Sequence, residues 1–162
     1  MQFKKYDRSS VDLFQHCLEQ KVLREDLSVH IGCDSILVEH NLYYFTVVAF
    51  RYNAKGAHFI YDREKRTPYR DGTGKPDIFT KLWEEARFTI ELSELLVERG
   101  IFNRDELVIE FDYNDIIKTV STKLIPSATG WAIGLGYKHI ILKSESQTAC
   151  KAANHLCQKL NP

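Results

Sequence analysis

The sequence predicts an α/β protein with a mixed five-stranded sheet, helices on both faces and an additional N-terminal helix. Three observations support this fold class. Apolar and polar residues alternate over three consecutive segments joined by short turns, three later segments show helical periodicity, and short apolar segments separate those helices. The 162 residues suit one domain. We therefore expect a single domain over residues 1–162, with residues 1–26 as an N-terminal helical extension.

The first half of the chain predicts one helix and an antiparallel meander. The helix covers residues 9–26, with Ser9 or Ser10 as its N-cap. Its expected apolar stripe consists of Val11, Phe14, Leu18 and Val22. Three strands follow, at residues 28–34, 42–52 and 57–62, with turns at 39–41 and 53–56. Because the links are so short, these strands should pair antiparallel.

The second half predicts helices that alternate with strands. A long helix over residues 77–99 should end before Gly100, which is a typical residue after a helix. The remaining expected elements are a strand at 105–112, a helix at 120–135 stopped by Gly136, a strand at 138–143 and a helix at 147–160. Strands linked through helices imply right-handed parallel crossovers. The predicted order is β-β-β-α-β-α-β-α.

Composition excludes several classes of protein. The chain is 44% hydrophobic and 27% charged, as in ordinary globular proteins. The apolar run at residues 45–50 is far too short to span a bilayer, and charges near the N-terminus do not suit a signal peptide. We therefore expect no membrane partner and a cytoplasmic location. The four cysteines form no CxxC pair, so a zinc site is not expected and reduced core thiols are.

Charge argues against a protein that coats nucleic acid, because 22 basic residues balance 22 acidic ones. The segment 63–76 is locally basic, with five basic and two acidic residues. It is either a solvated connector or a mobile flap that holds phosphates, with Tyr69 available for stacking. The candidate nucleic-acid-binding residues in it are Lys65, Arg66, Arg70 and Lys75.

Several acidic residues fall where chemistry would need them. Asp34 and Asp112 end two strands, on the faces opposite their apolar residues. Glu85 lies inside the apolar arc of the long helix, where it should pair with Arg99 or a lysine, become protonated or bind a metal. Glu145 is a fourth candidate, although it also suits a capping box between Ser144 and Gln147. Asn154 is an alternative to Glu145.

Carboxylates from separate elements, without a cysteine or histidine cluster, suit hard cations such as Mg²⁺ or Mn²⁺. Two such ions about 4 Å apart can promote the hydrolysis of a phosphodiester. The acidic candidates therefore indicate metal-dependent phosphodiester chemistry.

The order of elements and acids resembles the ribonuclease H fold, and more closely the YkuK-type family of bacterial ribonuclease H-like proteins. The resemblance covers about residues 28–160. It depends on Ile31-Gly32-Cys33-Asp34-Ser35, the helix of Glu85, Phe111-Asp112, Gly134-Leu135-Gly136-Tyr137, and residues 143–154 with Ala153-Asn154. It implies that Asp34, Glu85, Asp112 and Glu145 hold two Mg²⁺ or Mn²⁺ ions in a nuclease that acts on RNA, DNA or a hybrid. Glu145 falls where relatives more often have aspartate.

Other functions remain as alternatives. The neutral charge and the lack of an added nucleic-acid-binding module suit a non-catalytic binding or scaffold protein that keeps the fold. A sugar-kinase or actin-like nucleotide binder is disfavoured, because Asp34 is followed by Ser35-Ile36-Leu37 rather than by an Asp-x-Gly loop. A serine or cysteine hydrolase lacks its GxSxG motif and would need a lowered thiol pKa, which Asp34 opposes at Cys33.

Overall fold

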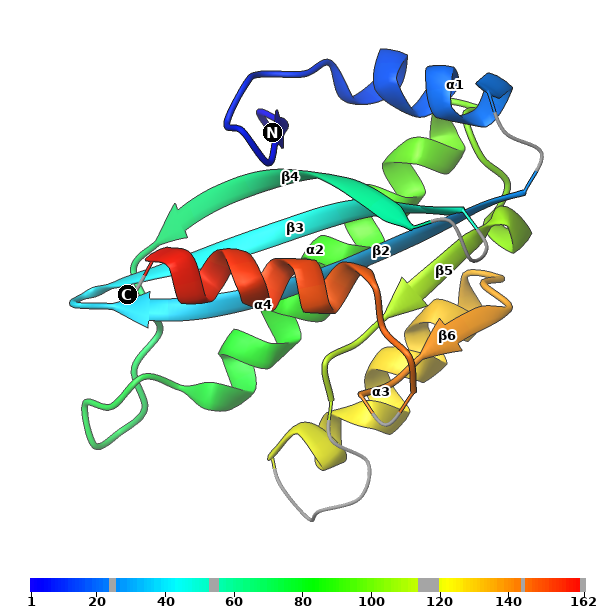
Figure 1. The fold of residues 1–162 in the computed structure, drawn as a ribbon. Coiled ribbons are helices and arrows are strands. Elements are labelled where there is room, and N and C mark those ends of the chain that lie inside the picture. Colours follow the sequence, from blue (N-terminus) through cyan, green and yellow to red (C-terminus); the bar gives the residue numbers. More distant parts are fainter. Residues whose placement is uncertain (24–25, 53–55, 114–119, 144, 161–162) are drawn as a thin grey trace.

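A computed structural model describes residues 1–23, 26–52, 56–113, 120–143 and 145–160 (Figure 1). Its strands are β1 (Lys4–Lys5), β2 (Leu27–Val38), β3 (Asn41–Tyr52), β4 (Ala57–Arg66), β5 (Leu107–Glu110) and β6 (His139–Ile141). Its helices are α1 (Leu13–Leu23), α2 (Ile78–Glu98), α3 (Val120–Gly134) and α4 (Ala149–Leu160). A short 3₁₀ turn at Arg104–Glu106 precedes β5. None of the described helices is long and apolar enough to cross a membrane.

The sheet is mixed, as predicted, but it has six strands rather than five, in the order β1-β4-β3-β2-β5-β6. The antiparallel meander β2–β3–β4 is confirmed, and β5 and β6 extend it in parallel through helical crossovers. The additional strand β1 pairs antiparallel with β4, joining Lys4 to Tyr61 and Lys5 to Ile60. Two residues are too few to show a period, which is why the sequence did not predict β1.

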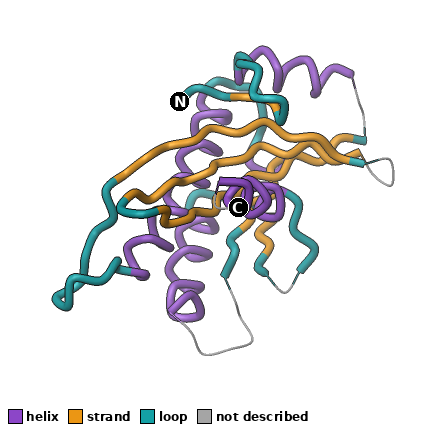
Figure 2. The backbone as a smooth tube through the Cα atoms, turned by 60° about the vertical axis from the view of Figure 1, so that its left-hand side comes forward, coloured by secondary structure: helices purple, strands orange, loops and turns teal. Residues whose placement is uncertain are grey.

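Helices cover both faces of the sheet (Figures 1 and 2). On one face, alternate residues such as Val29 and Ile31 of β2 and Phe50 of β3 join a core with α1, α2 and α3. On the other face, Phe45, Val47 and Ala49 of β3 pack under α4. The four cysteines are free and buried, as expected for core thiols.

The long helix α2 agrees with its prediction at both ends. Asp77 caps its N-terminus by accepting a hydrogen bond from the Phe79 amide, and Gly100 follows it with a φ of 67°. That left-handed conformation costs glycine little. The predicted burial of Glu85 is also observed, since only 4% of the residue is exposed.

Helix α1 is shorter than predicted; of its predicted apolar stripe, Val11 and Phe14 pack against the core, but Leu18 and Val22 do not. The helix begins at Leu13, and its N-cap is Asp12, whose carboxylate accepts a hydrogen bond from the Gln15 amide. The buried residues are Leu13, His16 and Cys17, whereas Leu18 and Val22 are exposed. The helix packs through a histidine and a cysteine, which hydrophobic periodicity does not select.

The segment predicted as a basic loop is partly strand. Strand β4 continues to Arg66 because β3 continues opposite it, pairing Leu42 with Arg66. Thus Lys65 and Arg66 lie on β4, and the connection to α2 begins only at Thr67. The prediction that Asp34 ends the first strand of the meander was wrong, because β2 stays paired with β3 as far as Val38. The last two strands and α4 are shorter than predicted by one or two residues at the ends that differ. Part of the predicted turn at 53–56 lies outside the described residues.

Candidate functional site

Asp34 and Asp112 meet at one edge of the sheet because β2 and β5 run parallel and in register. Their last paired residues are Gly32 and Glu110. Asp34 follows Gly32 by two positions, and Asp112 follows Glu110 by two. Since side chains alternate along a strand, the two aspartates leave the sheet on one face, just past the last parallel pair; β5 ends there, whereas β2 continues to Val38. Burial raises the pKa of Asp34, and the charge of Asp112 raises it further.

Glu85 approaches Asp34 from α2, which packs on the opposite face of the sheet. Ser35, the neighbour of Asp34, donates a hydrogen bond of 2.6 Å from its hydroxyl to Glu85 Oε1. The pKa of Glu85 is raised to about 6, because burial and the charge of Asp34 together outweigh the lowering by Lys81 and Ser35. Asp34, Glu85 and Asp112 are called the acid cluster below. Three elements supply it: β2, α2 and the segment after β5.

Two lysines compensate part of the negative charge of the acid cluster. Lys81, one helical turn before Glu85, places its Nζ 2.9 Å from Glu85 Oε1, and the charge of Asp34 also raises its pKa. Lys143, after β6, places its Nζ 3.2 Å from Asp112. The expectation that Glu85 pairs with Arg99 or a lysine is therefore confirmed for a lysine; Arg99 instead lies over the ring of Phe14.

The donor atoms of the acid cluster are carboxylate oxygens, which hard divalent cations prefer. A nearby cation would also lower the raised pKa values of Asp34 and Glu85. In the described part of the chain, however, no three acidic, histidine or cysteine side chains form a group that could hold a metal ion as they stand. Instead, the carboxylates of Glu85 and Asp112 form ion pairs with Lys81 and Lys143. Metal binding would require both ammonium groups to give up these oxygens.

None of the contacts that the structure describes joins either candidate for the fourth ligand to the acid cluster. Glu145 is exposed, and its carboxylate accepts a hydrogen bond of 3.3 Å from the amide of Leu142. Asn154 is exposed on α4 and accepts one from Gln158. The predicted capping box involves Ser144, which lies outside the described residues. Its other member, Gln147, precedes α4 and donates to the Phe111 carbonyl.

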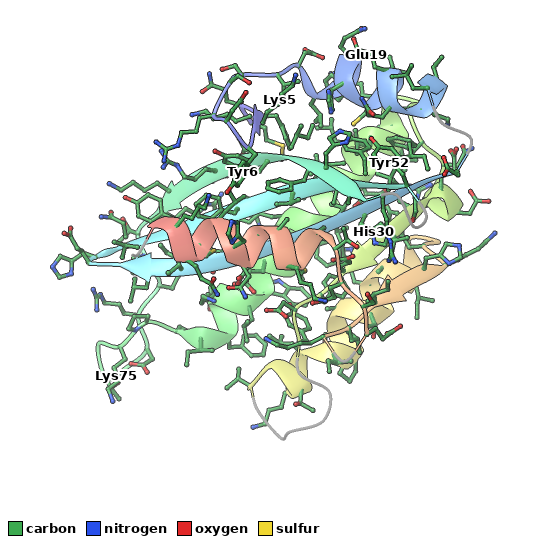
Figure 3. The ribbon with its side chains drawn as sticks, in the orientation of Figure 1. Lys5, Tyr6, Glu19, His30, Tyr52 and Lys75 are labelled. Atoms are coloured by element: carbon green, nitrogen blue, oxygen red, sulfur yellow. The ribbon has the colours of Figure 1, made fainter. Side chains whose placement is uncertain are left out.

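The predicted phosphate-binding residues are spread over two elements. On β4, Lys65 lies 5.9 Å from the ring centre of Tyr43, and Arg66 pairs with Glu64 and Glu84. In the loop, Arg70 donates to the Gly74 carbonyl, and Figure 3 shows Lys75 at the outer end of that loop. Arg66 is thus held by two carboxylates, whereas the side chains of the other three form no ion pair with a carboxylate among the described residues.

Sequence reasoning missed Ser35, Lys81, Lys143 and Glu110. The spacing of Lys81 and Glu85, four residues apart on one helix, was a usable signal for that pair. Glu110 is fully buried; its carboxylate lies 2.7 Å from His30 Nδ1 and accepts hydrogen bonds from the amides of Thr148 and Cys150. Figure 3 shows His30 beside this start of α4. Glu110 therefore holds α4 against β2 and β5, next to the acid cluster.

The sheet order, the parallel strands at its centre and the acids at their ends all agree with the predicted resemblance. A model of the ribonuclease H-like family matches residues 13–158. The chain belongs to the ribonuclease H-like family. This match covers most of the protein, from α1 to α4, and confirms the resemblance of the sequence to the YkuK-type proteins. No match was found among the curated proteins or among the solved structures.

Proposed function

We propose that this ribonuclease H-like protein is a Mg²⁺- or Mn²⁺-dependent phosphodiesterase that acts on nucleic acid. The observation that supports the proposal is that Asp34 interacts electrostatically with both Glu85 and Asp112, next to the place where the parallel pairing of β2 and β5 ends. Buried carboxylates that interact are typical of functional sites.

The proposed ligands are the three members of the acid cluster, with Glu145 or Asn154 as the fourth. A divalent cation at this site supplies Lewis-acid chemistry, since it polarises a phosphoryl oxygen and lowers the pKa of water. Ser35 orients Glu85 through its hydrogen bond. Lys81 and Lys143, once released from the carboxylates, remain close enough to contact phosphate oxygens of the substrate. Without a cation, two or three ionised carboxylates would repel a phosphodiester.

The direct test is cleavage of labelled RNA–DNA hybrid, duplex and branched substrates by the pure protein in Mn²⁺. We expect Asp34→Asn to lower the rate by more than about 100-fold, because even outer partners of a metal site typically cost about 10- to 100-fold. Asp105→Asn is the matched control, since Asp105 is exposed at the other end of β5. Activity that survives Asp34→Asn unchanged would contradict the site assignment.

The same assay identifies the fourth ligand. If Glu145 is a ligand, Glu145→Gln lowers the rate at limiting Mn²⁺ and excess Mn²⁺ restores part of it. If Asn154 serves instead, Asn154→Ala shows this behaviour and Glu145→Gln does not.

A second candidate function, a non-catalytic scaffold, is favoured by the two lysines. Lys81 and Lys143 already compensate Glu85 and Asp112, so the acid cluster needs no metal to be stable. Calorimetric titration with Mn²⁺ separates the two candidates. Binding that Asp34→Asn abolishes supports the phosphodiesterase, and no binding at millimolar Mn²⁺ supports the scaffold.

A further inference from the structure

A second candidate site lies on the face of the sheet that α4 covers, beside the N-terminal segment. It is a pocket of about 370 Å³ between β1, β4 and the end of α4. Four cationic residues line it: Lys4, Arg8, Arg63 and Lys159. They come from distant parts of the sequence and outside the predicted basic segment, except for Arg63. The four residues are called the cationic pocket below.

The charges of the cationic pocket are uncompensated. Its lining contains no carboxylate, and none of its four cations forms an ion pair with any acidic residue that the structure describes. By contrast, Arg66, Arg87 and Lys81 all pair with glutamates around α2. In a chain of zero net charge, four unpaired cations around one hollow create a local positive potential that attracts anions.

Aromatic rings accompany these cations. Tyr6 is half-exposed, packs edge-to-face on Phe59 of β4, and lies in a stacked geometry beside His155. Lys159 Nζ lies 4.1 Å from the ring centre of Tyr6 and is hydrogen-bonded to its hydroxyl group. Figure 3 shows Tyr6 at the β4 edge of the sheet. Cations interleaved with an accessible ring are the composition of surfaces that bind single-stranded nucleic acid.

The cationic pocket and the aspartates of the acid cluster lie on the same face of the sheet, with Phe45 and the overlying helix α4 between them. Asp34 is paired across the sheet with Phe45, and Phe45 with Arg63. Residues directly opposite one another in antiparallel strands share a face, so Asp34 and Arg63 point to the same side. Two strand spacings separate them, about 10 Å in all. Because Phe45 is buried under α4, a nucleic-acid strand that contacts both sites must pass around the end of this helix.

We propose that the cationic pocket binds backbone phosphates of a nucleic-acid strand whose neighbouring segment reaches the acid cluster. Arg63 and Lys159 hold phosphates, Lys4 and Arg8 extend the contact along the N-terminal segment, and Tyr6 stacks on a base. The path of the strand to Asp34 rests on the proposed function; the binding itself does not, because it requires neither a metal nor cleavage.

The experiment measures binding of fluorescently labelled single strands by anisotropy in EDTA, over a range of salt concentrations. The pocket variant is Arg63→Gln with Lys159→Gln. The control is Arg51→Gln with Lys138→Gln, which removes the same two types of charge from exposed positions on β3 and just before β6. We expect the pocket variant to bind about 10-fold more weakly in 0.1 M salt, and its salt dependence to fall by about 1.4 in slope. The control should stay within about 2-fold of the wild type.

Equal losses in the two variants, no loss in the pocket variant, or no binding by the wild type would each overturn the inference. The proposed function fails separately: a protein that binds through the cationic pocket but cleaves nothing in Mn²⁺ keeps this inference and loses the phosphodiesterase. If cleavage depends on Asp34 but kcat/KM is unchanged in the pocket variant, the phosphodiesterase is kept and this inference is lost.

Discussion

At the scale of single residues, Glu84 and Glu85 show how environment decides the role of a carboxylate. They are adjacent on α2, yet the pKa of Glu84 is lowered by its hydrogen bond from Arg87, whereas burial raises that of Glu85 to about 6. The ionised form of Glu84 therefore stabilises the fold, and the ionised form of Glu85 destabilises it. A residue that destabilises its own fold when charged is typical of a site kept for function.

We expect the stability of the metal-free protein to fall as pH rises through the titration of Glu85. Its ordinary pKa is 4.5 and its pKa in the fold is about 6, so between these values the folded state holds the proton more tightly. The unfolding free energy should therefore lose about 2 kcal/mol over this window. Glu85→Gln should remove that loss, so its stability relative to the wild type should rise by about 2 kcal/mol from pH 4 to pH 7.

Urea unfolding in EDTA at several pH values measures this difference. Glu84→Gln is the matched control, because its stability relative to the wild type should change with pH in the opposite direction. It should destabilise the protein at pH 7, and the difference from the wild type should shrink as the pH falls below 4.5, where the unfolded chain takes up its proton. If both variants followed the same trend with pH, the assigned pKa directions would be wrong.

At the scale of elements, the docking of α4 on β2 fixes the position of Asp34. Gly32 lies two residues before Asp34 and directly under the start of α4. A Cβ atom there would lie 2.7 Å from Cys150 Sγ and 3.1 Å from the Cys150 backbone nitrogen. The two elements can pack this closely only because position 32 has no side chain.

Gly32→Ala should therefore destabilise the protein by about 1–3 kcal/mol, as overpacking of a core typically does. Gly130→Ala is the control, because Gly130 lies within α3 and a Cβ atom there would meet no other atom within 4 Å. This substitution should stabilise the protein by about 0.5–1 kcal/mol. Chemical denaturation measures both changes. Adding Cys150→Ala to Gly32→Ala should restore part of the loss, and no restoration would show that the close contact is not the cause.

The elements also show what could be predicted from the sequence. The parallel pairing of β2 with β5 and the position of Glu85 follow from periodicity, so the three acids could be predicted to converge. The stripe of α1 could not, because this helix buries His16 and Cys17 and exposes Val22. The cationic pocket could not be predicted either, since β1 is only two residues long and Lys4 and Lys159 meet only in the folded chain.

At the scale of the whole molecule, zero net charge conceals a separation of charges over one face of the sheet. The acid cluster and the cationic pocket lie about two strands apart, on either side of Phe45. A cation at the acid cluster would extend the positive potential of the pocket toward Asp34. Zero net charge thus limits binding to nucleic acid over the whole surface. It still allows binding at the cationic pocket, which a metal ion at the acid cluster would strengthen.

Metal binding should also be visible in the stability of the whole molecule, because a ligand that binds only the folded state raises the unfolding free energy. At a Mn²⁺ concentration about 100 times its Kd, this gain is about 2.7 kcal/mol. For a domain of this size it corresponds to a rise in Tm of about 5–10 °C. Thermal unfolding with Mn²⁺ and then with excess EDTA measures the gain and its reversal. Asp34→Asn should abolish the rise, whereas Asp105→Asn should keep it.

Since Lys81 and Lys143 must first leave the carboxylates, the neutral variant Lys81→Met should show a larger rise in Tm than the wild type at the same Mn²⁺ concentration. An equal rise in the wild type and in Asp34→Asn would place the Mn²⁺ ion elsewhere.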